Sequence, residues 1–269
     1  MKKLAIIFLL IGSTVFAQKQ EKRQVADFAA IKVSQSIQLD FTYGGSKSVE
    51  VHVEDADDMQ YVKTEVKNGV LHVFIDTPTG IFKGRISPVH VQVSNPTLSG
   101  AYVSSSASLN VQNKILTKDL KITASSSAKF SSNLVQADNL VIEASSSAKV
   151  EGKFEIANST AIDVSSSAKV DLDLKGNKVD LAASSSARIE LDGSAKTVEA
   201  KVSSSGKIDA RDFAVKTLDG KASSSGVMTF TASDEVRGKA SSSGKISVYG
   251  SASLVEVKKS SGGKIEKIK

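Results

Sequence analysis

The stretch Ala124–Phe130, "ASSSAKF", decides the fold because the chain returns to it at nearly constant intervals. The serine triplet begins at Ser104, Ser125, Ser145, Ser165, Ser184, Ser203, Ser223 and Ser241, with a degenerate ninth copy at Ser260. Successive copies lie 18 to 21 residues apart. A fixed period of about 20 residues indicates a solenoid, in which each repeat is one structural unit stacked on its neighbours.

Within each repeat, apolar and polar residues alternate strictly, as in "LVIEASSSAKV" at 140–150. A period of two is typical of a β-strand with one buried face. The alternation runs through the triplet, so it also predicts that the middle serine, such as Ser126 or Ser146, points inward as a rung of a hydroxyl ladder. The residue after the triplet changes from alanine to glycine from Gly206 onward, which predicts less space toward the C-terminal end.

These units contain strand and turn but no helical half, and a propeller blade would need about twice their length. We therefore expect an all-β fold, a single-stranded parallel β-helix of the usual right hand with about 18–21 residues per coil. Nine coils at the strand spacing of about 4.8 Å would give a rod on the order of 40 Å long.

The chain divides into three segments. Residues 1–17 combine two lysines, an apolar run and a small-residue ending, which is typical of a secretory signal peptide. Residues 18–100 are rich in strands but lack the triplet, so they either begin the solenoid or cap it, and "KNGVLHV" at 67–73 predicts a hairpin. Residues 101–269 are the serine-tagged coils. We expect an exported protein of the periplasm, the outer cell surface or the extracellular space.

Composition narrows the function. The chain has no cysteine or tryptophan, and aromatic residues make up only 5%, so disulfides and an aromatic-rich ligand pocket are not expected. Without the two signal-peptide lysines, 33 basic residues stand against 29 acidic ones, a net charge of +4 with both signs interspersed. This balance favours neither nucleic acid nor a polybasic membrane contact. No cofactor and no membrane segment in the mature chain are expected.

Outward-facing residues of the repeats predict a candidate contact face. The outer serines and the basic residue that follows each triplet should form parallel exposed columns, although like charges at one-coil spacing repel one another. Hydroxyls beside a basic stripe suit an acidic glycan or a cell-envelope polysaccharide. The alternative is that these residues only keep a passive structural rod soluble. The candidate face comprises Ser125, Ser127, Lys129, Ser145, Ser147, Lys149, Ser165, Ser167, Lys169, Arg188 and Lys207.

Catalytic and metal chemistry have weaker support. All three histidines precede the repeats and no G-x-S-x-G motif occurs, so a serine triad is not indicated. A polysaccharide-active enzyme rests only on analogy with other β-helices, because the column of Glu143 and Asp163 continues into lysines and looks like a solvated face. His52, His72 and His90 lie 20 and 18 residues apart, so they would stack as a metal site if their strands were successive coils.

Several segments together resemble a known family. These are the tagged coils, the start "IKVSQSIQLDF", the turn "KNGVLHV", the junction "VHVQVSNPTLSGAYVSSSAS" and the signal peptide. They look like the auto-transporter adhesin, head GIN domain family, and the resemblance covers nearly the whole mature chain. It implies an exported bacterial β-helical domain. The sequence thus predicts a non-enzymatic adhesion or glycan-binding module; the alternatives are a passive structural envelope protein and a polysaccharide-active enzyme.

Overall fold

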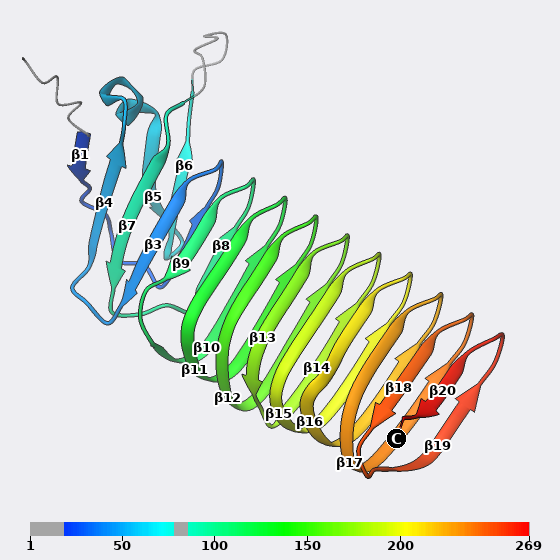
Figure 1. Ribbon diagram of the computed structural model, residues 1–269. Helices are drawn as coiled ribbons and strands as arrows, with labels where there is room; N and C mark the ends of the chain where they lie inside the picture. Colours follow the sequence, from blue (N-terminus) through cyan, green and yellow to red (C-terminus); the bar gives the residue numbers. More distant parts are fainter. Residues whose placement is uncertain (1–18, 78–85, 269) are drawn as a thin grey trace, which may run out of the picture.

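The protein is an elongated solenoid with a strand-rich cap at its N-terminal end (Figure 1). The computed structural model describes residues 19–77 and 86–268, so the expected signal peptide at 1–17 lies outside the described residues. Strands make up 67% of the structure and helix only 2%, in a parallel β-solenoid of about eight turns. The predicted fold class is confirmed. Among the described residues, no helix has the length and apolar character needed to cross a membrane.

Hydrogen bonds join all the strands into one continuous sheet that folds round the core as two walls. The incoming wall is the one that contains the strands leading into the serine triplets, and the outgoing wall contains the strands that leave the triplets. The strands of the cap extend each wall. The incoming wall contains, in pairing order, β5 (Val62–Lys67), β6 (Val70–Ile75), β2 (Ala30–Val33), β8 (Gly100–Val103), β10 (Ile115–Ala124), β14 (Lys178–Ala183) and β19 (Ser253–Lys259). The outgoing wall contains β1 (Lys19–Lys22), β4 (Ser48–Val53), β7 (Val89–Asn95), β3 (Gln38–Tyr43), β9 (Ser108–Val111), β13 (Lys169–Lys175), β18 (Lys245–Tyr249) and β20 (Lys264–Lys267).

Five long strands pass through both walls, bending at the edge opposite the triplets. They are β11 (Lys129–Ala144), β12 (Lys149–Val164), β15 (Arg188–Val202), β16 (Lys207–Ala222) and β17 (Val227–Ala240). Register shifts occur near this bend, for example between Ser132 and Val135 of β11. The bend thus absorbs the variation in coil length, while the register on either side of the triplet stays constant.

The cap continues the same two walls with antiparallel strands. β4 pairs antiparallel with β7, and β5 pairs antiparallel with β6. Asn68 and Gly69 both have positive φ in the tight β5–β6 turn, so the hairpin predicted from "KNGVLHV" is confirmed. A short 3-10 helix, η1 (Ala56–Tyr61), follows β4.

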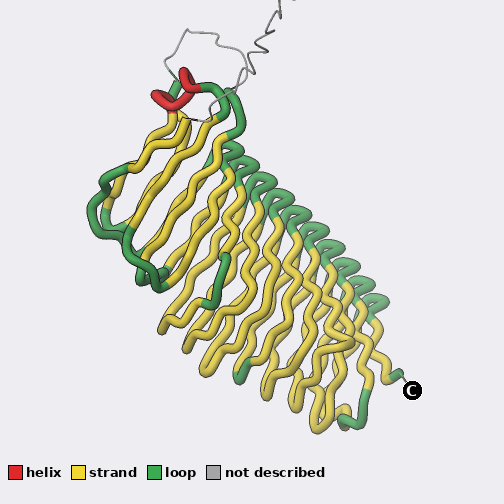
Figure 2. Tube along the Cα trace, turned by 60° about the vertical axis from the view of Figure 1, so that its left-hand side comes forward, coloured by secondary structure: helices red, strands yellow, loops and turns green. Residues whose placement is uncertain are grey.

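Each serine triplet forms a tight turn and not part of a straight strand (Figure 2). In the turn Ser125–Ala128, the Ala128 N–H donates to the Ser125 carbonyl at 3.2 Å. Ser126 and Ser127 have φ angles of 53° and 60°, the left-handed pair of a type I′ turn. The prediction that the middle serine points inward is therefore wrong, because the second and third serines are exposed and the first is half-buried.

Backbone hydrogen bonds stack these serine turns on one another. The Ser127 N–H donates to the Ser146 carbonyl at 2.9 Å, and the Ser147 N–H donates to the Ser166 carbonyl at 3.0 Å. The stack starts one turn earlier than the triplets indicate: Gln35 and Ser36 also have positive φ, and the Ser36 N–H donates to the Ser105 carbonyl. Among the described residues, no triplet hydroxyl donates to or accepts from another protein group, so the expected hydroxyl ladder is absent.

The core narrows toward the C-terminal end. Along the incoming wall, one inward row changes from isoleucine to glycine; it contains Ile122, Ile142, Ile162, Leu181, Ala200, Gly220 and Gly238. A Cβ on Gly220 would lie 3.0 Å from the Met228 Sδ, which comes from the facing wall. At the position that follows the serine triplet, a Cβ on Gly244 would lie 2.4 Å from the Ala222 carbonyl oxygen. The predicted loss of space is confirmed.

The left-handed backbone makes a prediction about the middle serine. Ser146→Val places a β-branched side chain at a φ of 51°, so we expect it to lower the free energy of unfolding by about 1–2 kcal/mol. Ser146→Gly suits the same φ and should stay within about 1 kcal/mol of wild type. Urea unfolding followed by circular dichroism measures both. Equal stability of the two variants would show that the turn conformation is not needed.

Candidate functional site

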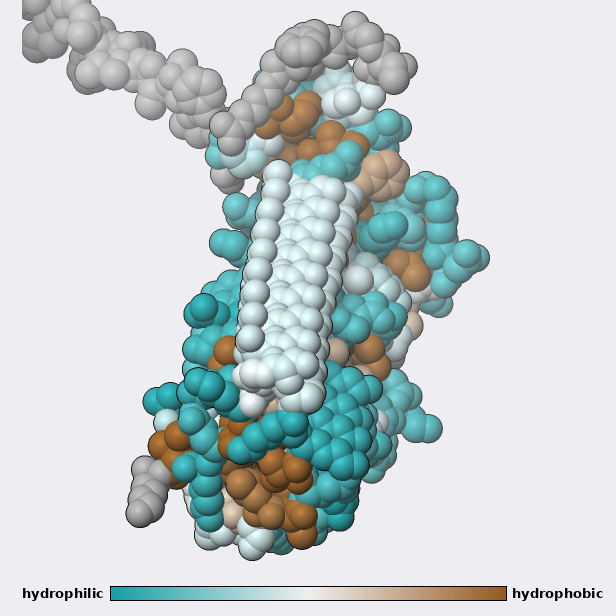
Figure 3. Space-filling view, turned by 90° about the vertical axis from the view of Figure 1, so that its right-hand side faces the viewer, coloured by the Kyte–Doolittle hydropathy of each residue, from teal (hydrophilic) through white to brown (hydrophobic). Residues whose placement is uncertain are grey.

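The second and third residues of the serine turns form a straight, exposed stripe along one edge of the rod, which we call the serine edge. Figure 3 shows it as a smooth band of small, pale residues that runs along the molecule between more polar margins. The side chains repeat at the spacing of neighbouring strands, about 4.8 Å. Since the hydroxyls have no partner within the described protein, they are available to solvent or to a ligand.

A row of basic residues borders this edge on the outgoing wall, as the spacing predicts. The register places in one row Lys129, Lys149, Lys169, Arg188, Lys207, Val227, Lys245 and Lys264. We call this set the basic row. The first five of these cations are the ones predicted for the contact face, and the structure brings them together beside the serines.

An acidic row, two residues further along most of these strands, offsets the repulsion between the cations. Its members are Glu151, Asp171, Glu190, Asp209 and Glu266. Lys169 Nζ lies 2.6 Å from Glu190 and 3.3 Å from Asp171, and Lys207 Nζ lies 2.9 Å from Asp209. The hydrogen bond that Lys169 donates to Glu190 raises the pKa of Lys169, and the hydrogen bond that Lys207 donates to Asp209 lowers the pKa of Asp209.

Lys129 is the exception within the candidate face. The position two residues after it is Ser131, where the following coils have Glu151 or Asp171. Across the part of the chain that the structure describes, Lys129 has no carboxylate within ion-pair distance. Its ammonium group therefore remains available, whereas Lys149, Lys169, Arg188 and Lys207 are each ion-paired.

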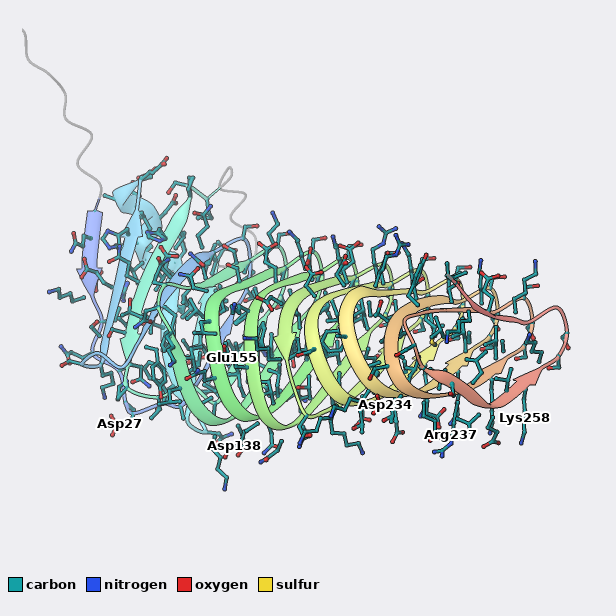
Figure 4. The ribbon with its side chains drawn as sticks, turned by 60° about the horizontal axis from the view of Figure 1, so that its bottom comes forward. Asp27, Asp138, Glu155, Asp234, Arg237 and Lys258 are labelled. Atoms are coloured by element: carbon teal, nitrogen blue, oxygen red, sulfur yellow. The ribbon has the colours of Figure 1, made fainter. Side chains whose placement is uncertain are left out.

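A second charged column borders the serine edge on the incoming wall. The register confirms the predicted order Glu143, Asp163, Ala182, Lys201, Lys221 and Lys239, and extends it to Lys258. Lys201, Lys221 and Lys239 have no ion pair with any described residue. In the C-terminal half, the serine edge therefore has cations on both sides, and Figure 4 shows Lys258 with its side chain outside the last coils.

The three histidines do not form a common site. His52 and His90 face each other across the antiparallel β4–β7 pair, with ring centroids 6.0 Å apart. His72 lies on β6 in the other wall, next to Lys32. Its pKa is lowered mainly by burial and, to a smaller extent, by the positive charge of Lys32. The expected stack of all three rings is wrong, because β6 with His72 lies in the incoming wall while β4 and β7 lie in the outgoing wall. Within residues 19–77 and 86–268, no group of three or more potential metal ligands occurs.

The bend carries an open hollow that the sequence pattern did not indicate. It has a volume of about 710 Å³ and is lined in part by Leu116, Asp138 and Glu155. Figure 4 labels the two carboxylates, which come from β11 and β12. Gln136 Nε2 donates to Glu155 at 2.6 Å. This edge escaped prediction because its register shifts disrupt the regular spacing that marks the serine turns.

The ion pairs of the basic row predict a pH dependence. Lys207 lowers the pKa of Asp209 in the folded protein, so the pair stabilises the fold above the ordinary Asp pKa of about 3.9. That contribution disappears as the pH falls through the lower, folded-state pKa. Lys207→Gln should cost about 0.2–1 kcal/mol at neutral pH and nothing in strong acid. Urea unfolding across the pH range measures this, with Lys129→Gln, which removes an unpaired cation, as the control. A cost that stays constant down to strong acid would contradict the pairing.

Comparison with known proteins gives the same overall assignment. The family profile described as "Putative auto-transporter adhesin, head GIN domain" matches residues 27–161 and 151–252. A comparison with curated proteins found no significant match.

Solved structures share the fold. A crystal structure of a putative adhesin from Parabacteroides distasonis superimposes with a TM-score of 0.70 at 24% identity, covering 94% of this chain and 97% of that one. A putative adhesin from Parabacteroides merdae gives a TM-score of 0.70 at 22% identity, with 94% and 96% coverage. A putative lipid binding protein from Parabacteroides distasonis gives 0.66 at 19% identity, with 94% and 97% coverage.

At these identities the superpositions establish the fold, and the family assignment rests on the two profile matches, which together span most of the chain. The eight complete serine turns, from Ser104 to Gly244, lie within the matched residues. The chain therefore belongs to the auto-transporter adhesin, head GIN domain family.

Proposed function

We propose that the protein is an exported, non-enzymatic adhesion module that binds glycans of a cell surface or envelope along its serine edge. The observation that carries this proposal is the set of exposed triplet hydroxyls, which lie in straight rows, have no hydrogen-bond partner among the described residues and have cations beside them. The name of the family supports adhesion as the class of function.

A rigid array of hydroxyls suits a repetitive ligand. The backbone of each serine turn is already fixed by hydrogen bonds to its neighbours, so little backbone entropy is lost on binding. Each hydroxyl can donate and accept, which matches the hydroxyl groups of a sugar. Individual contacts of this kind are weak, but many simultaneous contacts along one chain raise the overall avidity.

The charges beside the serine edge favour an anionic glycan. Four of the five basic residues predicted for the contact face share their charge with the acidic row, so their attraction for an anion is reduced. The unpaired cations Lys129, Lys201, Lys221 and Lys239 retain it. The proposed contact face therefore keeps the predicted serines and basic residues and adds the middle serines, such as Ser126, which the structure places outside.

Removing hydroxyls without disturbing the turns tests the proposal. A variant with glycine at the third position of four neighbouring turns (Ser127, Ser147, Ser167 and Ser186) keeps the left-handed backbone. We expect its retention on immobilised acidic glycans to fall by about tenfold or more, because four neighbouring contacts are lost together. Changing Lys129, Lys149, Lys169, Arg188 and Lys207 to Gln should also weaken retention. A glycan array first identifies the ligand class, and affinity chromatography then compares the variants.

A matched control changes charge at the opposite edge. Lys175, Lys196 and Lys216 lie exposed at the bend, so their replacement by Gln removes cations without altering the serine edge. Unfolding temperatures check that all variants are folded. Unchanged retention of both the serine and the basic variants would refute the contact face. A passive structural protein would retain no glycan at all, and a polysaccharide-active enzyme would release new reducing ends.

A further inference from the structure

The serine edge ends at a hollow beside the cap. This hollow has a volume of about 550 Å³, within the range of small-molecule sites. On one side lie Ser127 and Lys129, and on the other lie Ile86 and Pro88. The residues that line it come both from the first serine turns and from the segment that precedes β7.

The hollow exists because the basic row loses its long side chains here. In register with Lys129 are Ser108 of β9 and Gln38 of β3, where the following coils carry lysine or arginine. Ser108 is too short to fill the space that a lysine would occupy. A change of residue size within one row thus opens a pocket at the end of an otherwise flat face.

The far wall of the hollow is fixed by hydrogen bonds. The buried Asp58 of η1 accepts from the Ser87 N–H at 2.8 Å, and the Ser87 hydroxyl accepts from the Asp55 N–H at 3.3 Å. The far wall lies at the N-terminal end of the stack of serine turns. There β6 pairs with β2 and β7 pairs with β3, but no serine turn connects β6 to β7. A ligand that lies along the serine edge meets this wall.

The lining selects the chemistry of the ligand. Lys129 supplies one cation that has no ion pair with the described residues, and none of the described residues that line the hollow is acidic. Ser108, Ser127 and Gln38 supply hydroxyl and amide groups, none of which is hydrogen-bonded elsewhere in the described structure. Ile86 and Pro88 offer an apolar surface for the C–H face of a sugar ring. One carboxylate and several hydroxyls on a compact ring would complement these groups.

We infer that this hollow binds the terminal, carboxylate-bearing sugar of a glycan chain, with Lys129 holding the carboxylate. The inference rests on the proposed function and specifies its ligand: an acidic sugar at a chain end occupies the hollow, while the rest of the chain follows the serine edge. Lys129 is then distinct from Lys149, Lys169, Arg188, Lys207 and Lys245 of the basic row, each of which is ion-paired to a carboxylate.

Two variants one coil apart test this assignment. Glucuronic acid, with glucose as the neutral probe, is titrated into the protein and followed by NMR chemical shifts. A glucuronate-terminated oligosaccharide on a solid support measures retention. Lys129→Gln should weaken glucuronate binding by about tenfold or more, because a charge-assisted hydrogen bond is lost. Lys149→Gln, in the same row but ion-paired to Glu151, should weaken it far less. Lys196→Gln, at the opposite edge, is the control that should leave the affinity unchanged.

A third variant separates the shape of the hollow from its charge. Ser108→Lys introduces the side chain that most other coils carry in this row, so the fold should tolerate it. It adds positive charge yet fills the hollow. We expect it to abolish glucuronate binding, whereas simple electrostatic attraction would strengthen it.

The outcomes separate this inference from the proposed function. Wild-type affinity in Lys129→Gln, or tighter binding by Ser108→Lys, would overturn the terminal site while leaving binding along the serine edge intact. An equal loss in Lys129→Gln and Lys149→Gln would also overturn it, in favour of the whole basic row. No retention of the wild-type protein on any acidic glycan would overturn both.

Discussion

The structure depends on one repeated backbone arrangement, two successive serines in the left-handed region. For an L-residue this conformation costs on the order of 1–2 kcal/mol, so it persists only where other interactions hold it. Here the N–H of the third serine donates to the carbonyl of the middle serine in the next coil, as from Ser127 to Ser146. Each turn is stabilised by its neighbour, and the constant register of the coils follows from this stack. The variable bends occur only on the opposite edge.

The alternating pattern predicted the coil, the basic row and the charged column of the incoming wall, because side-chain direction in a strand follows residue parity. It did not predict the turn, for the same reason. Ala148 comes four positions after Ala144, so the serine turn leaves both on the inward side and the period of two continues unbroken. Serine also lacks the turn preference of Asn-Gly. The one local hint is Gly262, which takes the place of the third serine in the last copy and has positive φ.

For the charged residues, too, the sequence predicts the rows but not the contacts between the side chains. The basic row could be predicted from spacing, but its ion pairs could not be assigned, since they combine pairs within one strand, such as Lys207 with Asp209, with pairs across coils, such as Lys169 with Glu190. The cap was predicted only in part: the sequence indicated the β5–β6 hairpin but left open whether residues 18–100 begin the solenoid or cap it. Its strands alternate like those of the coils, so the pattern could not show that His52 and His90 are paired in the outgoing wall while His72 lies in the incoming wall.

The division of roles within the serine turn connects fold to function. If the hydroxyls held the coils together, they would be satisfied within the protein and a ligand would have to compete for them. Backbone hydrogen bonds hold the coils together instead. Gly262, with a φ of 75°, replaces the third serine in the last turn, so the turn does not require the third hydroxyl. Serine at these positions therefore gives no evident benefit to the turn, and even adds strain relative to glycine. The recurrence of serine in eight successive turns therefore supports the proposal that the exposed hydroxyls contact a ligand.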